Sequence, residues 1–346
     1  MLDLNANVLL IYTGGTVGMI EDFATGILKP IDFNYLKNYV PELSRLKFNI
    51  DSIAFERPID SSDMGPKDWE KIVQMIESNY EKYDGFVILH GTDTMAYSAS
   101  VLSFMLENLS KPVILTGSQL PIGKMRTDGR ENLITALEIA VDKDSDGNAF
   151  VPEVCIFFQN LLMRGNRTTK VNADNFNAFD SFNYPVLAEA GTYIKYEHHL
   201  IHRPHKNTTP KFHYYLNPNV TILKIFPGIS DNCVKVVFTN PYLKGVVLET
   251  FGAGNVPAHP SFLSIIEEAI NKGIVIVNVT QCASGAVEPD RYQGGKALKN
   301  IGVLSGYDIT TEAAITKLMF LFGHGLTSEE VKERMQSSIA GELTKS

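Results

Sequence analysis

The sequence predicts an α/β protein with a larger N-terminal domain on a mostly parallel sheet and a smaller α/β domain after it. Short apolar runs alternate with amphipathic segments of helical length, the pattern of parallel strands that helices cover on both faces. The alternation stops near residues 188–218 and then resumes. A chain of 346 residues is also longer than most single domains. We therefore expect two domains, residues 1–187 and 219–346, joined by a hairpin or linker at 188–218.

The N-terminal domain begins with the run VLLIY, which has no alternation of polar residues and fits a strand buried on both faces. The later runs GFVIL and VCIFF have the same character. Expected strands are 8–12, 85–89, 112–116 and 154–158, and expected helices are 66–79, 94–108 and 128–141.

The segment 188–218 breaks this pattern, since it contains five of the eight histidines together with lysines, threonines and prolines. Histidine clusters can bind metals, but no cysteine or carboxylate partner stands here at ligand spacing. A solvated hairpin is therefore favoured. After it, we expect strands at 220–226, 245–249 and 274–279 and helices near 260–271, 311–322 and 328–337.

Composition excludes several classes of function. The formal net charge is −8, which argues against a nucleic-acid groove built from clustered Lys and Arg. No apolar stretch approaches the ~20 residues of a membrane span, and the N-terminus lacks the basic region of a secretory signal. Cys155, Cys233 and Cys282 have no metal or disulfide spacing, which fits a cytoplasmic protein. Cys155 and Cys282 lie in apolar runs and are expected to be inert core thiols.

In open α/β sheets, ligands bind beyond the carboxyl ends of the strands, so the loops that follow strands are the candidate site. The first, TGGTVG at 13–18, matches neither nucleotide-binding glycine pattern, but its glycines suit an anion nest or oxyanion site. The second, DSSDM at 60–64, precedes an expected helix. It is interpreted either as an N-cap or as a grasp on a polar substrate.

The third loop, HGTDT at 90–94, places a hydroxyl beside a carboxylate at a strand end, and its capping box is incomplete. His90 has apolar neighbours and is expected to be a hydrogen-bonded core imidazole. The fourth loop, RGNRTTK at 164–170, is either a basic surface turn or the source of a lysine base. A lysine acts as a base where burial or neighbouring positive charge lowers its pKa, and Arg164 and Arg167 could supply that charge.

One segment, residues 142–153, matches a calcium-binding EF-hand loop. Asp142, Asp144, Asp146, Gly147 and Glu153 stand at the required positions. Pro152 precedes the last of these, and the run VCIFF that follows indicates a strand instead of the exit helix. A polar, exposed turn is favoured over a calcium site.

Together the loops resemble one family, the type I cytoplasmic L-asparaginases. YTGGTVGM, DSSDM, GFVILHGTDTMAYSAS, GSQLPIGKMRTDGRENL, MRGNRTTK, FPGIS, VTQCASG and the closing GELT are similar to that family's signatures, from about residue 8 to 344. The resemblance implies the two-domain asparaginase fold with a left-handed crossover in its N-terminal sheet. It also implies hydrolysis of the side-chain amide of L-asparagine to aspartate and ammonia without a metal or other cofactor, with weaker activity on glutamine. Homodimers or homotetramers are expected.

The resemblance also implies roles for residues of the four loops. Thr16 would be the nucleophile that forms an acyl-enzyme, and Thr92, Asp93 and Lys170 would form a second catalytic cluster. The substrate's α-amino and α-carboxylate groups would be held by Gly15, Asp60, Ser61, Ser62, Thr92 and Asp93. Backbone N–H groups at Gly15 and Thr92 are our candidate oxyanion donors, worth roughly 3 kcal/mol each.

Two positions depart from the family pattern. Ile27 stands where bacterial members usually have a tyrosine that assists the nucleophile, and Tyr292 is one candidate substitute. Some members bind asparagine at an allosteric site with an arginine and a cysteine. Of that site, Thr169 and Cys282 are a remnant here, but Glu249 stands at the arginine position and would repel a carboxylate.

Two other interpretations remain open. One is the asparaginase-like subunit of a tRNA-dependent amidotransferase, disfavoured because such subunits generally carry an extra N-terminal domain, whereas here the first strand begins at residue 8. The other is a silent amino-acid sensor, disfavoured because Thr16, Thr92, Asp93 and Lys170 are all present. Sequence alone does not fix the preference for asparagine over glutamine, since one methylene is worth only ~1–3 kcal/mol.

Overall fold

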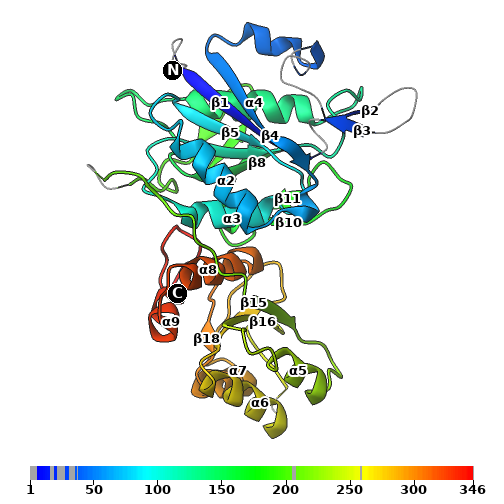
Figure 1. Ribbon diagram of the computed structural model, residues 1–346, viewed down its shortest axis with the longest axis vertical. Helices are drawn as coiled ribbons and strands as arrows, with labels where there is room; N and C mark the ends of the chain where they lie inside the picture. The colour runs from blue at the N-terminus through cyan, green and yellow to red at the C-terminus, as the bar shows by residue number, and fades with distance from the viewer. Residues whose placement is uncertain are drawn as a thin grey trace. The chain divides into compact units, whose positions relative to one another are not determined.

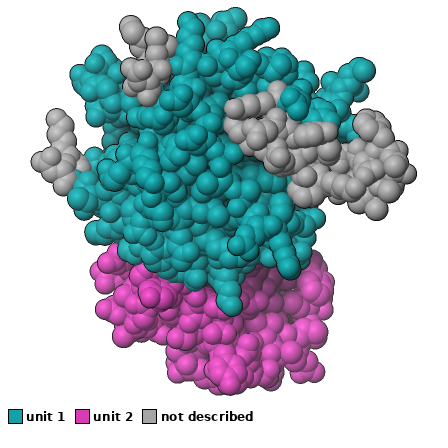
Figure 2. Space-filling model, turned by 45° about the horizontal axis from the view of Figure 1, so that its top comes forward, with its two compact units in different colours: residues 1–214 teal, residues 215–346 magenta. Residues whose placement is uncertain are grey.

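The computed structural model describes residues 6–15, 19–21, 28–30, 36, 38–204, 208–257 and 259–345. The chain divides into two compact units, residues 1–214 and 215–346, shown in different colours in Figure 2. The protein is of the mixed α/β class that the sequence predicts, with a large, mostly parallel sheet in the first unit and a smaller parallel sheet in the second.

The first unit is built on an eight-stranded sheet with the order β13-β12-β9-β8-β7-β5-β1-β4 (Figure 1). Neighbours from β4 to β8 are parallel, and β9, β12 and β13 extend the sheet in antiparallel pairing. The strands of this sheet are β1 (Asn7–Gly14), β4 (Asn49–Ile59), β5 (Gly85–Leu89), β7 (Val113–Thr116), β8 (Val154–Phe158), β9 (Leu161–Arg164), β12 (Ala188–Ala190) and β13 (Ile194–Tyr196).

Helices and short strand pairs complete this unit. The helices are η2 (Pro41–Arg45), η3 (Ser61–Asp63), α2 (Pro66–Glu77), α3 (Met95–Met105), α4 (Gly129–Val141) and η4 (Gly165–Arg167). The strand pairs are β2 (Met19–Glu21) with β3 (Leu28–Pro30), β10 (Thr169–Lys170) with β11 (Phe179–Asp180), and β6 (Leu106–Glu107) with β14 (Lys211–Phe212).

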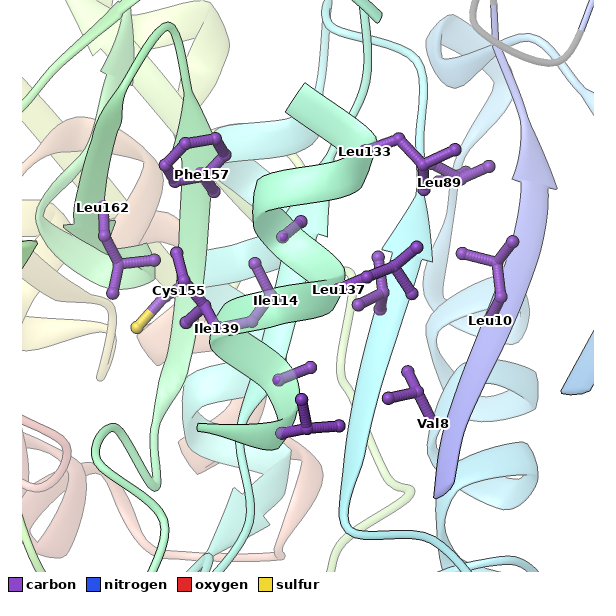
Figure 3. Close-up of a cluster of buried hydrophobic side chains, with 14 of the residues drawn as sticks. Val8, Leu10, Leu89, Ile114, Leu133, Leu137, Ile139, Cys155, Phe157 and Leu162 are labelled. Atoms are coloured by element: carbon purple, nitrogen blue, oxygen red, sulfur yellow. The ribbon is translucent and has the colours of Figure 1, made fainter. Parts of the chain in front are cut away.

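The side chains of the central strands are buried on both faces, as their unbroken apolar runs predict. On one face, Val8 and Leu10 of β1 pack in the same cluster as Leu133 and Leu137 of α4 (Figure 3). Cys155 of β8 lies in this cluster and is fully buried, which confirms its expected place in the core. Helices α2 and α3 cover the opposite face (Figure 1).

One of the crossover connections in this sheet differs in handedness from the others. The connections β4-α2-β5, β5-α3-β7 and β7-α4-β8 all step in the same direction along the sheet. Connections that step in one direction but lie on opposite faces must have opposite hands, and α4 lies opposite α2 and α3. The strong general preference for right-handed crossovers then assigns the left hand to β7-α4-β8. This is the feature that the resemblance to L-asparaginases implies.

The second unit contains a four-stranded parallel sheet with the order β15-β16-β17-β18. Its strands are β15 (Val220–Lys224), β16 (Gly245–Thr250), β17 (Val275–Thr280) and β18 (Leu304–Ser305). Its helices are α5 (Asp231–Val237), α6 (Pro260–Asn271), α7 (Gln293–Asn300), α8 (Thr311–Gly323) and α9 (Ser328–Met335). None of the helices in the part of the chain that the structure describes has the length and apolarity needed to cross a membrane.

Two expectations about burial are wrong. Cys282 is exposed, because it follows the last residues of β17 and lies beyond the apolar run. Arg164 and Arg167 do not form a basic surface turn, since both are almost completely buried. Arg164 pairs with the buried carboxylate of Glu153 at 2.7 Å, and that pairing makes its burial tolerable.

A chain of buried hydrogen bonds links α2, α3 and the end of β5. The Trp69 Nε1–H of α2 donates to Ser98 Oγ of α3 at 2.8 Å, and Ser98 Oγ lies 2.8 Å from His90 Nε2. His90 Nδ1 lies 2.6 Å from the Gly91 carbonyl oxygen. His90 is fully buried, which confirms the expected core imidazole, and burial lowers its pKa to about 4.

A fully buried ion pair holds the last residues of the chain against α8. Lys317 Nζ lies 2.5 Å from Glu342 Oε1, and neither side chain is exposed. Lys317 also donates to the Met335 and Ser337 carbonyls, and the Glu342 carboxylate accepts the backbone N–H groups of residues 339 and 340. Burial lowers the pKa of Lys317, and the carboxylate opposes that effect. Because both side chains are buried, loss of either partner leaves the other charge in the core without compensation.

We expect Lys317→Met to lower the free energy of unfolding by about 3–5 kcal/mol, because Glu342 is left buried and unpaired. Adding Glu342→Gln should restore part of that loss, since a neutral amide still accepts the backbone N–H groups. Denaturant unfolding followed by circular dichroism measures both. Equal stability of the single and double variants would contradict this account.

The buried His90 also predicts a pH dependence of stability. Its pKa is about 4 in the folded protein and 6.5 in the unfolded chain, so the unfolded chain binds more protons between these values. The free energy of unfolding should therefore rise by about 3 kcal/mol as the pH rises from 4 to 6.5 and gain nothing more from this residue above that. Trp69 is the only tryptophan, so its fluorescence reports urea unfolding of the first unit. In His90→Asn, the free energy of unfolding should rise less steeply with pH, by the equivalent of up to one bound proton. The same slope in the variant and the wild-type protein would refute the assignment of this pH dependence to His90.

Candidate active site

Three loops meet at the carboxyl edge of the large sheet, after β1, β4 and β5. Gly14 and Gly15 have positive φ angles of 136° and 84°, a region that favours glycine. A Cβ on Gly14 would collide with the Ile59 backbone, and one on Gly15 would collide with the backbone at Gly91. A Cβ on Gly91 would lie 2.6 Å from Ser61 Oγ. Glycine at these positions therefore lets the first loop touch the backbones at Ile59 and Gly91, and lets the third loop approach the Ser61 side chain.

The fourth loop adds a lysine to this edge. Lys170 lies on β10, and its Nζ donates to Thr92 Oγ1 at 2.9 Å and to Asp93 Oδ1 at 2.6 Å. The Lys170 side chain is 17% exposed and that of Asp93 is 68% exposed. A hydroxyl, an amine and a carboxylate thus lie within hydrogen-bond distance where solvent still reaches, which suits proton exchange with a bound substrate.

Gln119 is a neighbour of Thr92 to which the sequence gives no role. Thr92 Oγ1 donates to Gln119 Oε1 at 3.2 Å, and Gln119 Nε2 donates to the Asn175 carbonyl at 3.0 Å. The Gln119 backbone is fixed in turn, because its N–H donates to the Asp128 carboxylate. The sequence contains a signal for Gln119, since GSQ directly follows the expected strand 112–116, as the first and third candidate loops follow theirs.

The second loop is built on a short 3-10 helix. Asp60 is its N-cap, and Asp60 Oδ1 accepts both the Ser62 N–H and the Ser62 hydroxyl at 2.9 Å. These bonds lower the pKa of the Asp60 carboxyl, so it is charged at neutral pH. Ser61 is buried, and its carbonyl accepts the Thr94 hydroxyl at 2.6 Å, which ties this loop to the third one. The second loop therefore both caps a short helix and lies against the third loop.

Thr16 and Ile27 lie outside the described residues. Gly15, immediately before Thr16, is buried against Gly91, so the loop reaches its last described residue at the meeting point of the loops. Tyr292 is the N-cap residue of α7 in the second unit, and its side chain is 48% exposed.

The residues named as an allosteric remnant fall in both units. Thr169 precedes Lys170 on β10 of the first unit. In the second unit, Glu249 Oε1 accepts the Thr311 hydroxyl at 2.6 Å and Glu249 Oε2 lies 3.4 Å from Lys224 Nζ, while Cys282 is exposed.

The EF-hand-like segment forms a turn around Asp144. Asp144 Oδ1 accepts the N–H groups of Asp146 and Asn148, and Glu153 is turned away to pair with Arg164. Among the residues described, no group of three or more His, Cys, Asp or Glu side chains could hold a metal ion.

Comparisons with known proteins agree along the whole chain. The family model for the N-terminal domain of asparaginases matches residues 7–202, and the model for the glutaminase/asparaginase C-terminal domain matches residues 219–335. L-asparaginase 1 of Escherichia coli (strain K12) is 43% identical over 341 residues, which cover 98% of each chain. The crystal structure of L-asparaginase I from Vibrio cholerae superposes with a TM-score of 0.88 at 41% identity and covers 99% of this chain and 100% of its own.

A relative with a different name matches equally well in sequence. The 60 kDa lysophospholipase of Mus musculus is 42% identical over 359 residues, which cover 97% of this chain. This chain spans only 62% of the length of that mouse protein. The matched domains, the aligned relatives and the shared fold lead to one conclusion: the chain belongs to the asparaginase family.

Proposed function

We propose that this protein is an L-asparagine amidohydrolase, which hydrolyses the side-chain amide to L-aspartate and ammonia. The observation that carries the proposal is the cluster of Thr92, Lys170 and Asp93 at the edge where the glycine loops meet. The full-length similarity to proteins named L-asparaginase supports the same substrate.

In the proposed mechanism, the Thr16 hydroxyl attacks the amide carbon of the substrate. The C–N bond then breaks, the nitrogen leaves as ammonia with the proton that the hydroxyl gave up, and an acyl-enzyme remains on Thr16. An amide is a poor electrophile, so the attack needs a base for the hydroxyl proton and donors for the developing oxyanion. The N–H groups of Gly15 and Thr92 are the proposed donors. Water then cleaves the ester, returning the proton to Thr16 and releasing aspartate.

The second cluster is proposed to move protons in these steps. Lys170 lies next to the Thr92 hydroxyl and is held there by Asp93, so a proton can pass between Lys170 and Thr92 or a water held by Thr92. Gln119 accepts from the same hydroxyl and fixes its direction. The arrangement follows the logic of a serine–lysine pair, with a threonine in the place of the serine.

The charged ends of the substrate would be held at the second and third loops. The charged Asp60 and Asp93 suit the α-ammonium group, and the Ser61 hydroxyl suits the α-carboxylate, while Ser62 orients Asp60 through the hydroxyl that it donates. We further propose weaker turnover of glutamine, a cytoplasmic location and assembly into homodimers or homotetramers.

The first test is ammonia release from L-asparagine and L-glutamine by the purified protein. We expect Thr92→Val and Lys170→Met each to lower kcat for asparagine by about 10²–10⁴-fold, because each removes a proton-transfer group. The double variant should be little worse than either single variant, since the two residues act as a unit.

Lys195→Met is the matched control for the lysine variant. Lys195 also forms an ion pair, with Glu197 at 3.0 Å, but it lies exposed on β13. Its removal should leave kcat unchanged. Full activity in Thr92→Val or Lys170→Met would reject the proposed mechanism, and no turnover of either amide by folded wild-type protein would favour the sensor interpretation.

The charge pattern at Glu249 predicts weak or absent activation by asparagine at a second site. The carboxylate is already engaged by Thr311 and Lys224 and would repel the effector's carboxylate. The rate should therefore rise hyperbolically with asparagine concentration. A clear sigmoid in a steady-state titration would show that such regulation survives.

A further inference from the structure

We propose that His90 is a positioning residue for the reaction: it fixes the peptide between Gly91 and Thr92 so that the Thr92 N–H faces the substrate. The inference rests on the proposed function, in which that N–H stabilises the oxyanion. It assigns a role to a residue that lies wholly inside the core and touches no substrate.

The hydrogen-bonding capacities of the four groups determine the direction of every bond in the buried chain. The Gly91 carbonyl can only accept, so His90 Nδ1, 2.6 Å away, must carry a proton. A neutral imidazole has one N–H, so Nε2 is an acceptor and Ser98 must donate its hydroxyl proton to it. The indole of Trp69 can only donate, so it donates to the remaining lone pairs of Ser98 Oγ. One tautomer of His90 satisfies all three contacts.

Because the peptide between Gly91 and Thr92 is planar, the bond from His90 to the Gly91 carbonyl also fixes the direction of the Thr92 N–H. The peptide is trans, so the Gly91 carbonyl and the Thr92 N–H point in opposite directions. The carbonyl is held toward the buried imidazole, and the N–H is therefore turned away from it, toward the edge where Thr92 Oγ1 meets Lys170. Within the part of the chain that the structure describes, no group accepts a hydrogen bond from this N–H.

Glycine at position 91 makes such a restraint necessary. Gly91 lacks the side chain that limits backbone rotation elsewhere, and a Cβ there would collide with the Ser61 side chain. Without the bond to His90, the Gly91–Thr92 peptide could turn and move the N–H out of line. Trp69 and Ser98 anchor the imidazole to two packed helices, so the restraint is rigid.

Two substitutions separate the positioning role from simple packing. The side-chain amide nitrogen of asparagine lies where His90 Nδ1 lies, so His90→Asn keeps the donor to the Gly91 carbonyl and loses the contact to Ser98. The amide of the longer glutamine lies near the Nε2 position, so His90→Gln keeps a partner for Ser98 and loses the donor to the carbonyl. Both replace an imidazole by a neutral amide and both disturb the core.

We expect His90→Gln to lower kcat for asparagine by about 10- to 100-fold with KM within about threefold, because an oxyanion donor acts only in the transition state. His90→Asn should retain kcat within about threefold of the wild-type value. A purely structural role predicts instead that activity follows the melting temperature, whichever contact is kept.

Serine variants on α3 provide the matched comparison. Ser98→Ala removes the donor that fixes the tautomer, so both tautomers become accessible and kcat should fall severalfold. Ser100→Ala removes a buried hydroxyl two residues away that has no hydrogen-bond partner among the described residues. It should leave kcat unchanged.

The tautomer is measured directly on the wild-type protein by solid-state ¹⁵N spectroscopy after labelling of histidine. The spectrum at pH 7 should contain a protonated Nδ1 and an unprotonated Nε2 that disappear in His90→Asn. A protonated Nε2 for His90 would overturn the proposal whether or not any variant folds, and so would wild-type kcat in His90→Gln. Wild-type protein that hydrolyses neither amide would instead reject the proposed function, and the catalytic role of His90 with it.

Discussion

The close approach of three loops at the edge of the large sheet is the constraint on which the candidate site depends. Gly14, Gly15 and Gly91 lie where any Cβ would strike the backbone or side chain of a neighbouring loop. This contact brings the residue before Thr16 beside the residue before Thr92, although about 75 positions separate the two threonines. The loops follow parallel strands, so they lie at the same edge of the sheet. The glycines have no side chain that would keep the loops apart.

Much of the fold could be predicted, because the central strands and long helices are strongly patterned. Strands β5 and β8 and helix α6 have the predicted bounds. Strand β4 was missed because it lies at the sheet edge and most of its side chains are partly or fully exposed, so its sequence has no apolar run. Helices α5 and α7 have only seven and eight residues, and α7 contains two glycines, so their sequences lack a clear helical signal. Such short helices owe their stability to tertiary packing more than to their own periodicity.

The errors in burial arise from contacts between segments that are distant in sequence. Nothing near Arg164 indicates that Glu153 will meet it inside the core, so the charged loop looked like a surface turn. Cys282 follows an apolar strand closely enough to look buried, but the strand ends before it. The left-handed crossover is likewise a property of the whole sheet, which the resemblance could supply and periodicity could not. In the candidate site, the grouping of Thr92, Asp93 and Lys170 follows from the resemblance. Gln119 also lies in a loop after a strand, but only the structure reveals its contact with Thr92.

The two kinds of buried polar group in this protein suit different tasks. Glu153–Arg164 and Lys317–Glu342 are buried ion pairs that pin segments together, and each charge is tolerated only because its partner neutralises it. Beside the candidate site, the buried chain of Trp69, Ser98 and His90 is neutral. Since burial lowers the pKa of His90 to about 4, the imidazole keeps one protonation state from mildly acidic to basic pH. A neutral, pH-insensitive donor can orient the Gly91–Thr92 peptide while the titrating groups at the surface of the site exchange protons. Orientation and proton transfer are thereby assigned to separate residues, one set inside the core and the other at its edge.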